Sequence, residues 1–148
     1  MMTSKYFYIR RYKKGDFEEI IELWSRIGLG NKERGDNEQT IENTIALGGV
    51  FFVLVEKETN KIVGTSWITN DGRRLFLHHF GIDKNYQKRG LSKILLKETL
   101  LFTKEKQMQI KLEVHTSNKI AKELYKKHGF KYLGDYDIYI IRDVNTIL

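Results

Sequence analysis

The sequence predicts an α/β protein in which a mixed sheet is flanked by helices. Short apolar runs that suit strands alternate with segments whose apolar residues recur at helical spacing. Two of the apolar runs, residues 50–56 and 61–69, are separated by a polar tight turn and therefore predict a hairpin. The length of 148 residues fits one domain, so we expect residues 1–148 to fold as a single unit.

Composition limits the class of protein. Hydrophobic residues make up 41% and charged residues 30% of the chain, which is ordinary for a globular protein that does not enter a membrane. The chain has no cysteine, no apolar signal-peptide core and no apolar run near the roughly 20 residues of a membrane span. We therefore expect a cytoplasmic protein without a membrane partner. The net charge of +7 suits either a nucleic-acid binder or a protein that grips a phosphate-rich cofactor.

The first half of the chain predicts two helices and four strands. Asp16 suits the N-cap of the first helix, and Gly28 suits its end. The polar loop at residues 30–37 carries Glu33, Arg34 and Asp36, which face either a substrate or solvent. The expected strands are residues 6–12, 50–56, 61–69 and 74–82, and the expected helices are residues 17–27 and 40–47.

The second half predicts two further helices and three strands. Ile110, Leu112 and Val114 alternate with polar residues, as they would on one face of a strand, and Gly129 suits a helix C-cap. The complete order is β-α-α-β-β-β-α-β-α-β-β. The expected helices are residues 91–102 and 118–128, and the expected strands are residues 109–115, 130–134 and 137–142.

The stretch Gln87-Lys88-Arg89-Gly90-Leu91-Ser92 joins a strand to a helix through a glycine turn with two cations. The first backbone N–H groups of a helix have no intrahelical partner, and the helix dipole favours an anion beside them. Gly90 lets the backbone approach a ligand closely. Neither the dinucleotide fingerprint nor the Walker loop is present. The stretch therefore predicts either a phosphate site or a solvated surface turn.

Two motifs at a fixed separation carry a family resemblance. The first is Phe80-Gly81-Ile82-Asp83-x-x-Tyr86-Gln87-x-x-Gly90-Leu91-Ser92, and the second is Leu112-Glu113-Val114-x-x-x-Asn118-x-x-Ala121-x-x-Leu124-Tyr125-x-x-x-Gly129-Phe130. Over residues 75–134 the chain resembles the GNAT superfamily of acyl-CoA-dependent N-acyltransferases, and over residues 5–74 the likeness is topological. The segment around Glu113 resembles bacterial ribosomal-protein N-terminal-alanine acetyltransferases. Residues 87–92 resemble the family's pyrophosphate loop, [R/Q]-x-x-G-x-[G/A]. Ser92 stands where the family has glycine or alanine, but serine is small enough for the backbone to stay close to a ligand.

The resemblance implies a site for acetyl-CoA. Backbone N–H groups of the glycine turn would cradle its pyrophosphate, and cations there would meet its phosphates. The strands that end at Ile82 and begin at Ile110 would splay to form a slot for the pantetheine arm. A backbone N–H near Phe80 would polarise the thioester carbonyl. The implied cofactor-binding residues are Phe80, Gly81, Ile82, Gln87, Lys88, Arg89, Gly90, Leu91, Ser92 and Asn118, the last of which also suits an N-cap.

The resemblance also implies the catalytic groups. Tyr125 matches the tyrosine that many members place near the cofactor sulfur, where a phenol can donate a proton. Glu113 matches the position of a glutamate that serves as the base in the ribosomal-protein N-terminal-alanine acetyltransferases. His78 and His79 are alternative bases, and we expect at most one of them in the slot because adjacent strand residues face opposite sides. No cluster of residues in the sequence suggests a metal.

The function expected from this resemblance is transfer of an acetyl group from acetyl-CoA to a primary amine by direct attack in a ternary complex. One alternative is a non-catalytic acyl-CoA-binding or interaction module of the same fold. A basic nucleic-acid-binding domain ranks last, because no recognisable nucleic-acid motif is present. The acceptor is open between a small molecule and a protein N-terminus or lysine, and a homodimer is left open. We expect Trp24, Trp67 and the loop at residues 30–37 to shape the acceptor pocket.

Overall fold

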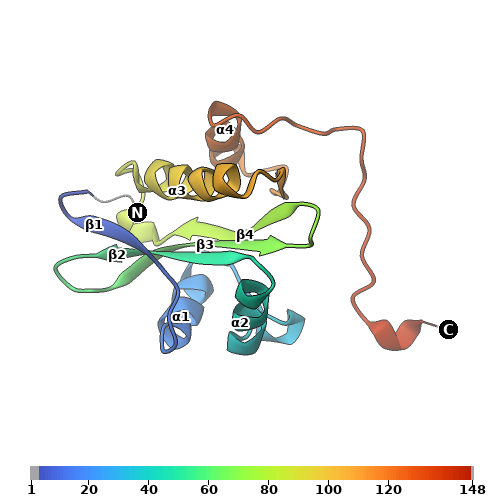
Figure 1. Cartoon of the computed structure of the whole chain (residues 1–148), viewed down its shortest axis with the longest axis horizontal. Coiled ribbons are helices and arrows are strands. Elements are labelled where there is room, and N and C mark those ends of the chain that lie inside the picture. The colour runs from blue at the N-terminus through green and yellow to red at the C-terminus, as the bar shows by residue number, and fades with distance from the viewer. Residues whose placement is uncertain (1–3, 148) are drawn as a thin grey trace. The chain divides into compact units, whose positions relative to one another are not determined.

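A computed structural model describes residues 4–147 of the chain (Figure 1). These residues divide into two compact units, residues 4–113 and residues 114–147, which are described in turn.

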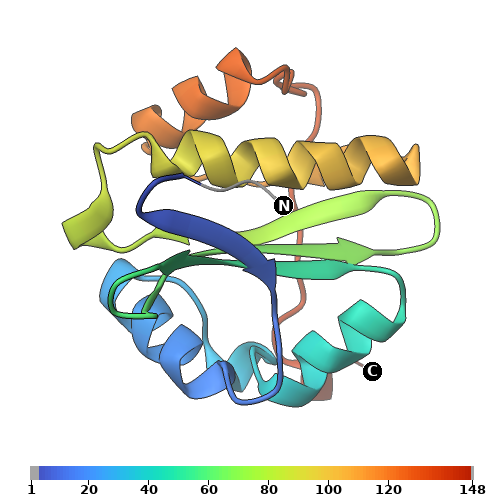
Figure 2. The same cartoon turned by 60° about the vertical axis from the view of Figure 1, so that its left-hand side comes forward.

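The first unit is a five-stranded sheet in the order β1-β2-β3-β4-β5, with helices on both faces (Figure 2). The first four strands pair antiparallel, and β5 pairs parallel with β4. Helices α1 and α2 cover one face, and α3 covers the other (Figures 1 and 2). The strands are β1 (Phe7–Arg11), β2 (Val50–Glu56), β3 (Ile62–Asn70), β4 (Leu75–Ile82) and β5 (Ile110–Leu112), and the helices are α1 (Phe17–Ile27), α2 (Glu38–Ala46) and α3 (Leu91–Lys106).

One part of the core of this unit lies between the sheet and helices α1 and α2. Strand β2 is buried at every position from Val50 to Val55, because helices cover the sheet on both sides, and this explains its unbroken apolar run. Trp24 of α1 and Trp67 of β3 stack with ring centroids 6.0 Å apart. The cluster on this face comprises Phe17, Ile20, Leu23, Trp24, Ile41, Phe51, Val53, Val55, Ile62 and Trp67.

Strand β4 contains a bulge where it passes β3. Trp67 pairs with His78 and Thr65 pairs with Gly81, so His79 and Phe80 together lie opposite a single β3 residue. The φ angle of His79 is +43°, in the left-handed region. As a result, the rings of His78 and His79 both contact Trp67, at 5.8 and 5.2 Å. The expectation that these histidines face opposite sides is therefore wrong, because the bulge interrupts the alternation of the strand.

Strand β5 accompanies β4 along only part of its length. The parallel pairing joins Leu75–Leu77 to Ile110–Leu112 and ends there. The β4 residues from His78 to Ile82 continue beyond the last paired residue of β5. This register agrees with the splayed strand pair expected from the sequence, although β5 is shorter than the expected strand at residues 109–115.

The second unit contains α4 (Lys119–Lys127) and a short 3₁₀ helix at Val144–Thr146. The two strands expected at residues 130–134 and 137–142 are not formed in the described structure, and that part of the prediction is wrong. Apolar, β-branched composition favours a strand only when a neighbouring strand supplies partners for its backbone N–H and C=O groups. Here the side chains are exposed instead, with Tyr139 at 90% and Ile138 at 66%. The remaining elements follow the expected order, so the mixed α/β fold class is confirmed.

Candidate functional site

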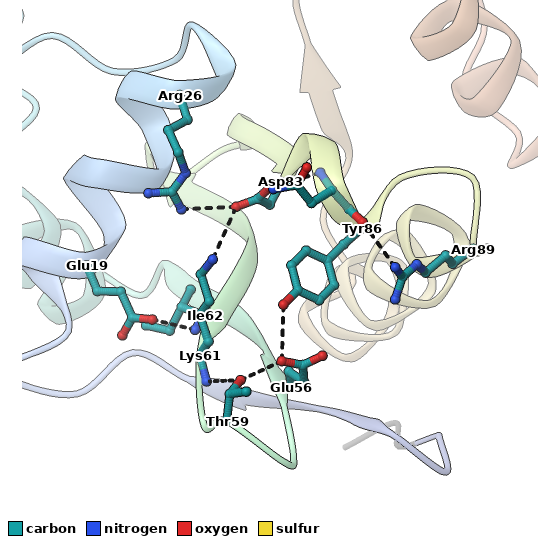
Figure 3. Close-up of polar contacts among 10 residues, drawn as sticks. Glu19, Arg26, Glu56, Thr59, Lys61, Ile62, Asp83, Tyr86 and Arg89 are labelled. Atoms are coloured by element: carbon teal, nitrogen blue, oxygen red, sulfur yellow. Dashed lines mark hydrogen bonds and ion pairs between the residues drawn. The ribbon is translucent and has the colours of Figure 1, made fainter.

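The turn between β4 and α3 is anchored by Asp83, whose side chain is almost fully buried. Its Oδ2 lies 3.0 Å from Arg26 Nη2 of α1 and 3.9 Å from Lys61 Nζ, while Oδ1 accepts the Asn85 N–H at 3.0 Å (Figure 3). Burial alone would raise the pKa of Asp83, but the Asn85 N–H and the two cations outweigh it and hold that pKa below its ordinary value. Asp83 therefore acts as a charged anchor for the start of the turn.

Tyr86 ties the same turn to strand β2. Its hydroxyl donates to Glu56 Oε2 at 3.1 Å (Figure 3). The Arg89 guanidinium lies 5.1 Å from the centroid of the Tyr86 ring and donates to the Asn85 carbonyl at 3.1 Å. The sequence prediction missed Arg26, Lys61 and Glu56 as supports of this turn, because they come from α1, the β2–β3 turn and β2, and no spacing links them to it.

The backbone between the turn and α3 adopts a shape suited to anions. Lys88 and Gly90 both have left-handed φ angles, +62° and +74°, and such local reversals gather successive N–H groups into a concave surface. Gly90 is the N-cap of the 16-residue helix α3 and provides no side-chain cap for its first turn. A Cβ placed on Gly90 would meet no atom of the described structure within 4 Å, so the space in front of this turn is open. These features fit a diphosphate.

The β4 bulge fixes the direction of one backbone amide. The Thr65 hydroxyl donates to the His79 carbonyl at 2.7 Å, so that carbonyl points toward β3. In a trans peptide the N–H points opposite to the C=O, and the described chain contains no cis peptide bond. The Phe80 N–H is therefore directed away from β3.

The two histidines of β4 have different partners. His79 Nε2 lies 3.0 Å from Asp36 Oδ2, in the loop between α1 and α2. His78 Nε2 lies 2.9 Å from Thr69 Oγ1 of β3. Burial, assisted by the neighbouring His79, lowers the pKa of His78 to about 4. His78 is thus a neutral structural group at neutral pH, whereas His79 contacts the Asp36 carboxylate, a pairing that the sequence did not predict.

The structure buries the two tryptophans that the sequence assigned to the acceptor pocket. Trp24 and Trp67 are 0% and 4% exposed, and their indole N–H groups donate to Thr65 and Thr44. The ring of His79 lies 4.4 Å from that of Trp24. The tryptophans are therefore buried and pack against the His79 ring, and they do not face solvent themselves.

The remaining predicted residues lie after β5. Glu113 follows directly after that strand and is exposed. In the second unit, Asn118 is the N-cap of α4, and its Oδ1 accepts the Ala121 N–H at 3.1 Å. Tyr125 of α4 is only 9% exposed and contacts Phe130 at a ring distance of 5.5 Å. Burial raises the pKa of Tyr125 to about 12, so its phenol keeps its proton at neutral pH.

Among residues 4–147, no group of three or more histidine, aspartate or glutamate residues is arranged to hold a metal ion. Within the same residues, no helix combines the length and the apolar character required to cross a membrane.

Comparison with known proteins gives consistent results. A model of the acetyltransferase (GNAT) family matches residues 17–130. A GNAT acetyltransferase from Staphylococcus aureus is 25% identical over 88% of each chain, with a TM-score of 0.77. The ribosomal-protein-S18-alanine N-acetyltransferase of Escherichia coli is 20% identical over 84% of this chain and 77% of its own, with a TM-score of 0.71. A predicted acetyltransferase from Clostridium acetobutylicum, solved with acetyl-CoA, is 19% identical over 90% of this chain and 96% of its own, with a TM-score of 0.71.

Proposed function

Because the chain belongs to the acetyltransferase (GNAT) family, whose members use acetyl-CoA, we propose that it transfers the acetyl group to the nitrogen of a primary amine. The reaction is a direct attack by the amine in a ternary complex of protein, acetyl-CoA and acceptor. One observation carries the proposal. The N-terminus of α3, which is open and has a backbone shape suited to anions, follows strand β4, and β4 continues past the end of its pairing with β5.

The first part of the proposal concerns how the chain holds acetyl-CoA, which supplies the acetyl group as an activated thioester. Backbone N–H groups from Gln87 to Ser92 bind its pyrophosphate, supported by the left-handed geometry at Lys88 and Gly90. The β4 residues Phe80 to Ile82 offer main-chain groups to the pantetheine arm as an added strand would. The direction of the Phe80 N–H suits a donor to the thioester carbonyl, where negative charge develops during the reaction.

The second part concerns protons. A lysine-like ammonium has a pKa of about 10.4 and must lose a proton before it can attack, while the departing thiolate is helped by gaining one. We assign the acid to Tyr125, whose protonated phenol suits this role. The sequence assigns the base to Glu113, with His78, His79 or a water as alternatives. The proposed acceptors include protein amines, since the Escherichia coli protein of the same fold is named a ribosomal-protein-S18-alanine N-acetyltransferase, and they extend to small-molecule amines.

A thiol-release assay tests this function. The purified chain is supplied with acetyl-CoA and, separately, with an alanine-terminated peptide amide, an Nα-blocked lysine amide, spermidine and kanamycin. We expect coenzyme A release that depends on at least one of these amines, and mass spectrometry should find that amine heavier by one acetyl group. Calorimetry with acetyl-CoA alone measures binding independently. Tight binding without turnover on any amine would favour the non-catalytic alternative, and absence of both would refute the assignment.

A further inference from the structure

We propose that His79 is the base that takes the proton from the acceptor amine, and that Asp36 positions it. This inference rests on the proposed function and specifies which side of the sheet the acceptor occupies. It selects one of the candidate bases from the contacts of the folded chain.

The pair has the geometry of a base with its orienting carboxylate. Asp36 Oδ2 lies 3.0 Å from His79 Nε2 and also accepts the Asn31 N–H at 2.6 Å, so the loop itself fixes the carboxylate. In a neutral imidazole that donates from Nε2, the lone pair resides on Nδ1. When Nδ1 takes a proton, the nearby carboxylate stabilises the imidazolium that forms. The side chains of His79 and Asp36 are 18% and 16% exposed, which limits competing water but leaves the pair accessible.

The bulge holds this ring in place and links it to the predicted oxyanion donor. Trp24 and Trp67 contact the His79 ring at 4.4 and 5.2 Å, on the sheet face that α1 and α2 cover. The carbonyl of the same residue is fixed by Thr65, and that peptide unit continues into the Phe80 N–H. Adjacent residues of one bulge thus supply a proton acceptor and an amide donor. An amine that reaches both must approach from the side of the α1–α2 loop.

The alternative bases are less well suited. His78 contacts Thr69 through Nε2, and burial together with the charge of His79 lowers its pKa to about 4, so it is a weak acceptor for an ammonium proton. Glu113 is exposed beyond the end of β5. Two titratable side chains of the described residues face His79: the Asp36 carboxylate, at 3.0 Å, and the His78 ring, at a centroid distance of 6.4 Å.

His79 Nδ1 takes one proton from the acceptor ammonium, and the freed nitrogen lone pair forms the bond to the thioester carbonyl carbon. The carbon–sulfur bond breaks, and the sulfur leaves with its electron pair. The nitrogen then loses its second proton. One of the two protons ends on the sulfur to give the free thiol, and the other reaches solvent through His79, which returns to its neutral form.

The experiment compares His79→Asn with Glu113→Gln, using the most active amine of the four-amine panel. Asparagine tolerates the left-handed backbone of position 79 better than most residues and cannot act as a base. At pH 7 we expect kcat/KM of His79→Asn to fall by about 10²-fold or more, the usual contribution of a positioned base. The loss should shrink steeply toward pH 9.5, where solution supplies deprotonated amine. Affinity for acetyl-CoA should stay within about threefold, a difference well below the catalytic effect.

Two further variants separate chemistry from structure. Asp36→Asn should move the acidic limb of the kcat/KM profile to lower pH, because an uncharged partner no longer favours the imidazolium. The exposed His115, changed to asparagine, serves as the matched control and should leave the profile unchanged.

Several results would overturn the inference while leaving the proposed function intact. One is an active wild-type chain together with a His79→Asn variant that has a near-normal kcat/KM and an unchanged pH profile. Another is a pH-dependent loss that appears in Glu113→Gln instead. A third is loss of acetyl-CoA binding by His79→Asn, which would make the histidine structural. A wild-type chain that binds no acetyl-CoA would refute the proposed function itself.

Discussion

The Thr65 hydroxyl and the main-chain carbonyl of His79 are joined by a hydrogen bond of 2.7 Å across the β3–β4 bulge. The same hydroxyl accepts the Trp24 indole N–H at 2.9 Å and is fully buried. One oxygen therefore connects helix α1 to the peptide between His79 and Phe80, whose N–H is directed away from β3. A bulge adds local twist and re-aims side chains, and here it needs this connection to hold a non-glycine residue at positive φ.

Replacing Thr65 by valine should weaken both stability and catalysis. Valine keeps the shape of threonine but leaves the buried indole N–H without its acceptor, which costs about 1–3 kcal/mol. We expect urea unfolding to show that loss and steady-state assays to show a lower kcat with little change in acetyl-CoA affinity. Thr65→Ser keeps the hydroxyl and should recover most of the kcat. Equal rates for the valine and serine variants would mean that the bond to His79 does not orient the site.

The parts of the structure that follow from local signals could be predicted from the sequence. The glycine turn before α3 carries its own information, since a strand pattern, Gly90 and a helix pattern follow one another directly. Strand β2 was predicted because burial on both sides leaves an unbroken apolar run. The splay of β4 and β5 was expected only from the family resemblance, and the residue at which their pairing ends, Leu77, was not predicted.

The features that escaped prediction depend on distant residues. Asp36 and His79 are far apart in the chain, and nothing in either local pattern indicates that they pair. The side on which the two histidines lie also escaped prediction, because the β4 bulge places both on one face, which strict alternation excludes. The strand expected at residues 137–142 has the right composition, but composition does not reveal whether a partner strand is present. Each of these features is decided by tertiary contacts rather than by propensity.

Changing Gly90 to glutamate should abolish acetyl-CoA binding. The side chain would project a negative charge into the open space before the first turn of α3, where the diphosphate is proposed to bind. Calorimetry should detect at least a 10²-fold loss of affinity, equivalent to about 3 kcal/mol. Gly72→Glu is a matched control, because Gly72 also has a positive φ of +85° and open space around it, but lies in the β3–β4 turn. If both variants bind acetyl-CoA equally well, the diphosphate assignment is wrong.

Changing Tyr125 to phenylalanine should lower turnover while acetyl-CoA affinity stays nearly intact. The variant removes only the phenolic oxygen, whose proton remains bound at neutral pH because burial raises the pKa to about 12. We expect kcat to fall by about 10²-fold, within the range for loss of a positioned acid. Tyr132, which is 86% exposed, provides the matched phenylalanine control. A large loss of acetyl-CoA affinity in the Tyr125 variant would instead assign this residue a structural role.

The buried His78 should make the free energy of unfolding fall as the pH is lowered, and replacing His78 should remove this part of the pH dependence. Its folded pKa of about 4 lies below the ordinary value of 6.5, so the unfolded chain binds a proton that the folded chain excludes. Stability from this group is complete above pH 6.5 and is lost between pH 6.5 and 4, reaching a loss of about 2 kcal/mol at pH 5. His78→Gln has no titrating ring and can still bond to Thr69. Urea unfolding at pH 7.5 and pH 5 should therefore show a smaller loss of unfolding free energy in the variant than in the wild-type chain. Identical losses would contradict this account, because they would show that His78 titrates alike in the folded and unfolded states.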